Sequence, residues 1–217
     1  MWFSDRPRPQ QRLANDLGEL FLIIPLQNYS NFCKGFWSVI SKEWSGIDHH
    51  RLDKFLLLVR RAIFNQLKKL NQENWDDKLV KKFLQVLAEI PLSGDQRIPN
   101  GIPFHLIDIY ADELERLMFS ELEEDEEDGD QEDLAKQRQE IIDETPLKDL
   151  IGPFEKLSQS ALNRTLRDKI KEDLLHDPRL VAWGVKKSAN EENEDKEKGE
   201  EIEEEEAESE DEWKGFD

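Results

Sequence analysis

Apolar residues recur at every third or fourth position along most of the chain, the spacing of an amphipathic α-helix. The longest such segment covers residues 47–70, and Asp48 is placed to cap its start. Its apolar stripe consists of Leu52, Phe55, Leu56, Val59, Ile63, Phe64, Leu67 and Leu70. No run of alternating apolar and polar residues stands out, so the pattern predicts helices and no strands.

Shorter helices are predicted before and after this segment from the same spacing. Their approximate ranges are 13–24, 32–40 (with Ser30 as the cap), 75–90, 103–117, 145–154 and 162–174. Prolines bound several of them, because proline lacks the N–H that a helix interior needs, and Pro153 is expected to shorten or kink its helix. The segment PLSGDQRIPNGI (91–102) is dense in Pro, Gly, Asn and Asp, which predicts a loop.

The helices and short loops together favour an all-α fold of stacked antiparallel hairpins, an irregular HEAT-like or α-solenoid bundle. The chain of 217 residues is long enough for one domain with a real core. We expect the helical domain to cover residues 1–185, interrupted by an acidic disordered insert at about 120–140. An acidic disordered tail is expected at 186–217.

Charge is unevenly distributed between the helical segments and two acidic runs. The chain has 50 acidic and 30 basic residues, for a net charge of −20. Residues 121–133 hold ten carboxylates and no base, and residues 191–212 hold fifteen carboxylates and two lysines. The remainder contains 25 acidic and 28 basic residues, so the helical body is close to neutral. The net charge therefore does not argue against binding to nucleic acid.

The sequence offers no recognisable catalytic, nucleotide or metal motif, and we expect no enzyme activity and no cofactor. Neither a phosphate-binding loop nor a G-x-G-x-x-G motif occurs. The four histidines and one cysteine do not stand at ligand spacing, and the adjacent His49 and His50 would point about 100° apart on a helix. Cys33, in an apolar run, is expected to be a buried and inert thiol. No apolar stretch reaches the roughly 18 residues of a membrane span, and the start does not have the pattern of a signal peptide.

Basic residues off the apolar stripes are the best candidates for binding. They are Arg51, Lys54, Arg61 and Lys68 on the longest helix, and Lys78, Lys81 and Lys82 on the next one. These side chains form either an ordinary solvated face or a surface that contacts RNA phosphates or a protein partner. Trp37, Trp44 and Trp75 fall on or beside apolar stripes, which favours packing in the core over base stacking.

Several segments resemble a known family in both content and order. They are MWFSDRP (1–7), GFWSVISKEWSGIDHHRLDKFLLLVRR (35–61), NWDDKLV (74–80), PLSG (91–94), GIPFHLIDIYADELERL (101–117), PLKDLIGPF (146–154) and IKEDLL (170–175). The chain resembles the ribosomal RNA processing protein 1 family, whose animal members are also called Nop52. Family members usually carry a further segment before the WFSDRP motif.

The resemblance implies a non-catalytic, all-helical assembly factor of the large (60S) ribosomal subunit precursor. Such a factor is nuclear and nucleolar, and is needed for pre-rRNA processing toward 5.8S and 25S/28S rRNA. The partners that it implies are the precursor particle and other assembly factors, including proteins with Brix and WD40 domains. The basic residues named above leave direct contact with pre-rRNA open, and the sequence gives no reason to expect a membrane. The alternative that the acidic runs leave open is an acidic chaperone for basic proteins such as histones or ribosomal proteins.

Overall fold

The computed structural model describes residues 1, 3–120, 122 and 131–186. The chain divides into two units, Met1–Asp177 and Pro178–Asp217. All regular structure in the described residues is helical, which confirms the all-α prediction. The helices of the first unit are α1 (Pro7–Ile23), α2 (Leu26–Glu43), α3 (His49–Gln72), α4 (Asp77–Glu89), α5 (Gly101–Phe119), α6 (Gln131–Glu144), α7 (Leu147–Ser160) and α8 (Arg164–Lys169). A short helix, α9 (Pro178–Ala182), lies in the second unit.

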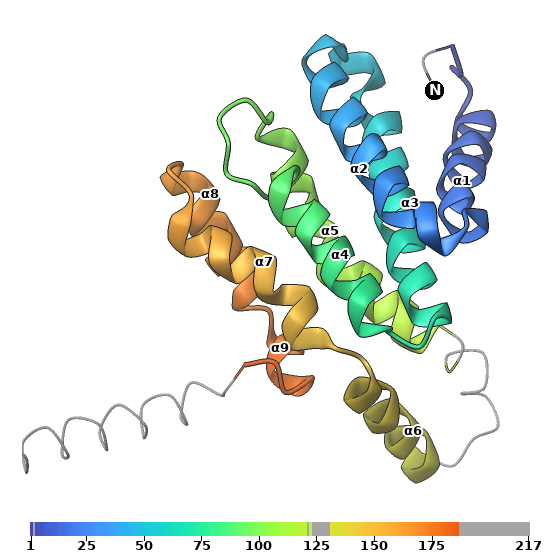
Figure 1. The fold of residues 1–217 in the computed structure, drawn as a ribbon, viewed down its shortest axis with the longest axis vertical. Helices are drawn as coiled ribbons and strands as arrows, with labels where there is room; N and C mark the ends of the chain where they lie inside the picture. Colours follow the sequence, from blue (N-terminus) through green and yellow to red (C-terminus); the bar gives the residue numbers. More distant parts are fainter. Residues whose placement is uncertain (2, 121, 123–130, 187–217) are drawn as a thin grey trace, which may run out of the picture. The chain divides into compact units, whose positions relative to one another are not determined.

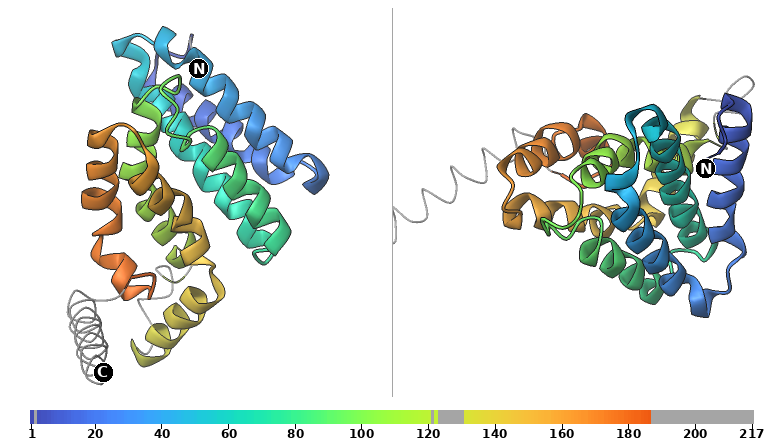
Figure 2. Two further views of the ribbon diagram at one scale, coloured as in Figure 1. Left: turned by 60° about the vertical axis from the view of Figure 1, so that its left-hand side comes forward. Right: turned by 90° about the horizontal axis from the view of Figure 1, so that it is seen from above.

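The helices of the first unit form two layers (Figure 1). In one layer α1 packs on α3, α3 on α5, and α5 on α8 and the π-helical turn Ile170–Leu175 that continues α8. In the other layer α4 contacts both α2 and α7. Figure 2 shows the same helices from two further directions. Contacts of α1 with α2 and of α7 with α8 join the layers, so the unit is built from stacked helical hairpins.

A glycine allows α1 to approach α3 closely. A Cβ atom at Gly18 would lie 2.9 Å from Asn65 Nδ2 and 3.0 Å from the Arg61 carbonyl oxygen. Separations this short are well inside van der Waals contact, so any larger residue would push the two helices apart. This position therefore fixes which face of α3 is covered by α1.

A buried polar contact joins α2 to α3 inside an otherwise apolar core. The Tyr29 hydroxyl donates to the Gln66 carbonyl oxygen at 2.7 Å, and Trp37 Nε1 donates to Gln66 Oε1 at 3.1 Å. All three residues are fully buried. Buried polar groups of this kind are stable only when they are hydrogen-bonded, so this contact fixes the register between the two helices.

Several local expectations need correction. Ser30 lies inside α2, which begins at Leu26 and has Pro25 at its N-cap position, because a proline fits the start of a helix. Asp48 does stand at the N-cap of α3, but its side chain pairs with Arg51 and makes no cap hydrogen bond. Pro153 does not shorten its helix, since α7 continues to Ser160. Trp75 precedes α4, whose cap is Asp76, accepting from Leu79 N at 3.0 Å.

The acidic insert is only partly covered by the described residues. Residues 123–130 lie outside them, as does most of the expected acidic tail. Helix α6 begins at Gln131, inside the segment that was expected to be disordered, and it contacts α5. Acidic residues in its first turn, Glu132 and Asp133, favour a helix start because they interact with the positive end of the helix dipole.

Candidate functional site

Lys54 is the one predicted contact residue that the structure removes from the surface. Its side chain is only 3% exposed, and Nζ donates to the Ser4 carbonyl oxygen at 2.9 Å and lies 3.5 Å from Asp5 Oδ1. The lysine therefore holds the N-terminal segment against α3. The expectation that it lies on a solvent-facing basic surface was wrong, because the segment before α1 folds over it.

The other predicted residues do not form one continuous surface. Arg51 pairs with Asp48 at the start of α3. Arg61 and Lys68 lie further along α3, separated by seven positions and therefore on one side of the helix. Lys78, Lys81 and Lys82 are exposed on α4, in the other layer, where Lys81 pairs with Asp77 at 3.1 Å.

Arg61 belongs instead to a cluster of three arginines between α3 and α5. At its centre is Glu113, whose side chain is completely buried. Arg60 pairs with Glu113 through Nε and with Asp112 at 3.6 Å, and Arg116 pairs with Glu113 at 3.3 Å. Burying an unpaired ion costs roughly several kcal/mol, so a buried carboxylate is tolerated only when partners such as these arginines pair with it. We call Arg60, Arg61, Glu113 and Arg116 the arginine cluster.

Arg61 is the member of this cluster with the least compensation. Its Nε is buried and has no hydrogen-bond partner in the described part of the chain. Burial and the neighbouring Arg116 guanidinium lower the pKa of Arg61, Glu113 acts in the opposite sense, and Arg60 lowers it further. The positive charges of the cluster therefore crowd one another, and an added anion would relieve this repulsion.

An aromatic ring links the arginine cluster to a pocket. The Arg116 guanidinium carbon lies 4.3 Å from the centroid of the Phe64 ring, in cation–π geometry. Phe64 also lines a cavity of about 320 Å³ between the end of α3, the end of α5 and α6. We call this cavity the α3–α6 pocket. It is lined by Phe64, Lys68, Asn71, Gln72, Trp75, Leu117, Met118, Ser120, Leu122, Ile141, Glu144 and Thr145.

The end of α3 places Trp75 in this pocket through a specific backbone turn. Trp75 N donates to the Leu70 carbonyl oxygen at 2.9 Å and Asn74 N to that of Asn71 at 2.9 Å, the hydrogen bonds of a Schellman motif. Asn74 and Trp75 have φ of 49° and 54°, a region that residues with a side chain adopt at a cost in free energy. Sequence reasoning assigned Trp75 to the next helix and missed this turn, although an asparagine after a long helix is a known signal for it.

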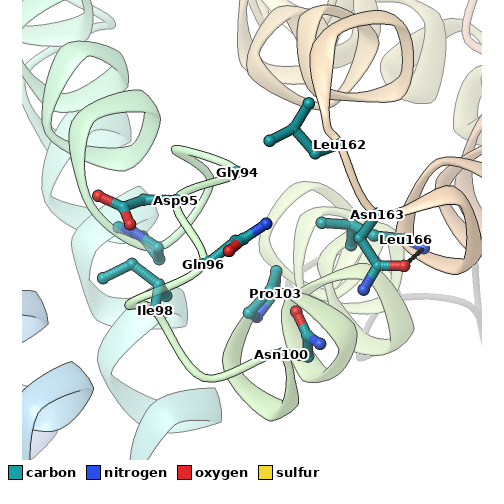
Figure 3. A pocket seen from close by; sticks show the side chains of 10 residues that line it. Gly94, Asp95, Gln96, Ile98, Asn100, Pro103, Leu162, Asn163 and Leu166 are labelled. Carbon is teal, nitrogen blue, oxygen red and sulfur yellow. Dashed lines mark hydrogen bonds between the residues drawn. The ribbon is translucent and has the colours of Figure 1, made fainter.

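Two other hollows lack this combination of charge and aromatic rings. A pocket of about 330 Å³ lies between the loop before α5 and the α7–α8 loop, and Figure 3 shows residues that line it. Asp95, one of these residues, pairs with Arg97 at 2.6 Å. Leu162, which lines this pocket, is 78% exposed. An apolar groove of about 780 Å³ lies between α1, α2 and α3. Its lining includes Leu20, Phe36, Val39, Phe55 and Leu58, and Glu43 is its one charged residue.

Elsewhere the described residues offer little that resembles a reaction centre. They contain no group of three or more His, Cys, Asp and Glu side chains that could hold a metal ion. Cys33 is buried as expected, and burial raises the pKa of its thiol to about 12. None of the described helices is long and apolar enough to cross a membrane.

Comparison with known proteins places the chain in a family. The profile of the family described as nucleolar protein Nop52 matches residues 1–216. The chain belongs to the Nop52 family. The family description is nucleolar, and this agrees with the resemblance seen in the ordered sequence segments.

Curated relatives of this Nop52-family chain carry names that refer to ribosomal RNA processing. Human ribosomal RNA processing protein 1 homolog B is 33% identical over 167 residues, covering 76% of this chain and 19% of the human protein. Mouse homolog A is 32% identical over 127 residues, 58% of this chain and 26% of the mouse protein. The Drosophila melanogaster homolog is 31% identical over 129 residues, which cover 56% of this chain and 18% of the fly protein. The chain thus spans about a fifth of the human and fly relatives' length.

Proposed function

We propose that this chain acts as a non-catalytic nucleolar assembly factor of the large ribosomal subunit precursor. In this role it supports the pre-rRNA processing that leads to 5.8S and 25S/28S rRNA. The single observation that carries the proposal is membership of the Nop52 family over residues 1–216, with relatives named for ribosomal RNA processing.

The architecture is suited to a scaffold. The two layers, joined as antiparallel hairpins, present long faces on which proteins or RNA can lie, and each helix packs against its neighbours. A charged surface lies on one side of α3 and an apolar groove on the other. A body with two such different surfaces can contact more than one component of a particle.

The partners in this proposal are other assembly factors, including proteins with Brix and WD40 domains, together with pre-rRNA. The rival role is an acidic chaperone for histones or ribosomal proteins, which the acidic runs at 121–133 and 191–212 favour. The two roles differ in which part of the chain is needed. A scaffold requires its helical body, whereas a chaperone requires its acidic runs.

Rapid depletion of the protein in its own cells, followed by re-expression of variants, tests the proposal. We expect depletion to cause precursors of the large-subunit rRNAs to accumulate while small-subunit rRNA maturation continues, measured by RNA blotting. The protein should sediment with the large-subunit precursor on a sucrose gradient, and a variant lacking both acidic runs should still do so. Normal rRNA processing after depletion, or loss of sedimentation only when the runs are removed, would contradict the scaffold role.

A further inference from the structure

The arginine cluster and the α3–α6 pocket form one continuous surface, although each is built from several helices. Phe64 belongs to both, since Arg116 stacks on its ring and the ring lines the pocket. Lys68 lies one turn further along α3 and also lines the pocket. A ligand that bridges the two parts would therefore meet positive charge at one end and a partly aromatic, polar cavity at the other.

The charged end has the properties of a phosphate-binding surface. Arg60 and Arg116 pair with the buried Glu113, whereas the Nε of Arg61 is buried without a partner among the described residues, so a phosphate would be held by the terminal nitrogens of Arg61. The planar guanidinium group donates several hydrogen bonds in a fixed fork that matches the oxygens of a phosphate. Stacking on Phe64 holds Arg116 in one orientation, so less side-chain entropy is lost when it binds.

The pocket end matches an unpaired nucleobase. A cavity of about 320 Å³ is at the lower end of the range for small-ligand sites, which suits a single base rather than a larger molecule. Trp75 and Phe64 supply aromatic rings, and the amides of Asn71 and Gln72 supply both donors and acceptors. Proteins that bind single-stranded RNA combine these elements, stacking the base on an aromatic ring and bonding its edges.

An acidic polypeptide fits this surface less well. It would satisfy the arginines, but Glu144 lines the pocket and would repel a carboxylate placed there. The same carboxylate can accept a hydrogen bond from the amino group of a base. An acidic chain would also leave the two aromatic rings and the two amides of the pocket without groups that match them. The combination therefore favours RNA.

We propose that this surface binds single-stranded RNA, with phosphates held by Arg61, Lys68 and Arg116 and one unpaired base held in the α3–α6 pocket. The inference rests on the proposed function for the identity of the RNA, which would be a single-stranded part of pre-rRNA. The lysines of α4 that the sequence singled out are not part of this site, because α4 lies in the other layer.

The test uses the full chain and a fluorescent single-stranded RNA of mixed sequence, with affinity measured by anisotropy over a range of salt concentrations. The first variant, Arg61→Gln with Lys68→Gln, should weaken binding and reduce the salt dependence by about 0.7 in slope for each lost phosphate contact. The matched control, Lys78→Gln with Lys82→Gln, removes the same charge from α4 and should bind like the unchanged protein. Equal losses in both pairs would overturn the proposal, because they would reflect charge alone.

A second pair of variants tests the pocket and does not depend on charge. Asn71→Ala with Gln72→Ala changes two exposed side chains at the end of α3, so the fold should be retained. Trp75→Leu removes the larger ring and should weaken RNA binding about fivefold or more, the usual effect of losing one stacked base. Polyphosphate, which has no bases, should bind both pocket variants as it binds the unchanged protein. RNA binding that both variants leave unaltered would overturn the assignment of the pocket.

The competitor experiment separates RNA from a protein ligand. Poly-glutamate should displace the RNA only weakly compared with unlabelled single-stranded RNA. If poly-glutamate competes equally well, and its binding is lost in the Arg61 and Lys68 variant, the surface is a site for acidic polypeptides and the proposal fails. Sedimentation of these variants with the precursor particle is scored separately. Loss of RNA binding with retained sedimentation leaves the assembly role intact, whereas normal processing after depletion of the protein refutes the assembly role alone.

Discussion

Helix α3 supports two surfaces of opposite character on either side of α1. On one side Phe55 and Leu58 line the apolar groove, which has a volume of about 780 Å³ and a single charged lining residue. On the other side the arginine cluster surrounds a buried carboxylate and adjoins a pocket of about 320 Å³ with amides, hydroxyls and a lysine in its lining. The same helix thus carries its exposed apolar area and its excess positive charge on different sides.

The difference lies in how strongly each surface is tied to the stability of the fold. Exposed groove residues such as Leu20 and Val39 gain only part of the free energy of burial, so these positions can change at modest cost. In the arginine cluster, each change alters the environment of a carboxylate that has no access to water. The charged surface is therefore constrained by folding as well as by any ligand, whereas the groove is constrained mainly by what it contacts.

The largest effect is expected from removing both partners of Glu113. In Arg60→Ala with Arg116→Ala, the carboxylate stays buried without its two ion pairs, and breaking a buried pair in this way costs about 3–5 kcal/mol. The free energy of unfolding, measured with urea, should fall by an amount of this order. Each single variant should cost clearly less, because one arginine still pairs with the carboxylate. Additive effects of the two single variants would show that the cluster does not act as a unit.

The next largest effect compares two positions on α3. Ile63 is fully buried, and truncation to Ala should cost about 2–5 kcal/mol through lost burial and a cavity. Phe55 lines the groove and is half-buried, so Phe55→Ala should cost less, although its side chain is larger. Thermal melts of the two variants provide the measurement. A greater loss from Phe55→Ala would mean that Phe55 contributes to the core as much as a fully buried residue does.

Helix periodicity was enough to predict the helices but not how deeply each face is buried. The apolar stripe of α3 is not buried along its whole length, since Leu52, Phe55, Leu56 and Phe64 are half-buried. Spacing of three and four identifies one side of a helix, and it does not say which neighbours cover that side. Lys54 illustrates the same limit, since its burial depends on Ser4 and Asp5, fifty positions away in the sequence.

The candidate site was only half visible in the sequence for a related reason. Arg61 and Lys68 could be selected because they lie off an apolar stripe. Glu113 and Arg116 stand in a segment that contains several acids, where no pattern marks one carboxylate as buried. Trp75 was assigned to a helix because its backbone turn depends on local hydrogen bonds that periodicity does not report. Predicting a site that forms between helices therefore requires knowing how the helices pack, as well as the apolar pattern along each of them.

A smaller effect is expected at the rim of the groove. Val39 is 62% exposed, and Val39→Ser should change the free energy of unfolding by no more than about 0.5 kcal/mol. The same substitution should leave single-stranded RNA binding unchanged, because the groove and the arginine cluster lie on different sides of α1. Urea unfolding and the anisotropy assay provide both measurements. A change in RNA affinity would mean that the two surfaces are coupled or that RNA extends across α1.

The last expected effect is a dependence of stability on pH that comes from the α5 side of α3. His105 on α5 is half-buried, and its Nε2 lies 2.9 Å from the Leu56 carbonyl oxygen, to which it donates. Burial lowers the pKa of His105 below its usual 6.5, opposed by the hydrogen bond to Leu56 and by Asp108, while Arg60 lowers it further. The unfolded chain therefore binds a proton more readily than the folded chain. The contribution of neutral His105 to stability is complete above about pH 6.5, and it is lost as the pH falls through the lowered pKa that His105 has in the folded state.

Urea unfolding between pH 5.5 and 7.5 should consequently show stability that decreases toward the acidic end, with a slope that cannot exceed about 1.4 kcal/mol per pH unit for one proton. His105→Gln should flatten this dependence, because a glutamine amide can donate to the same carbonyl oxygen and does not titrate. His176→Gln, at an exposed position, is the matched control and should leave the dependence unchanged. The groove contains no histidine among its lining residues, so Phe55→Ala should shift the whole curve without changing its slope. If His105→Gln retains the full slope, His105 is not the source of the pH response and this prediction is wrong.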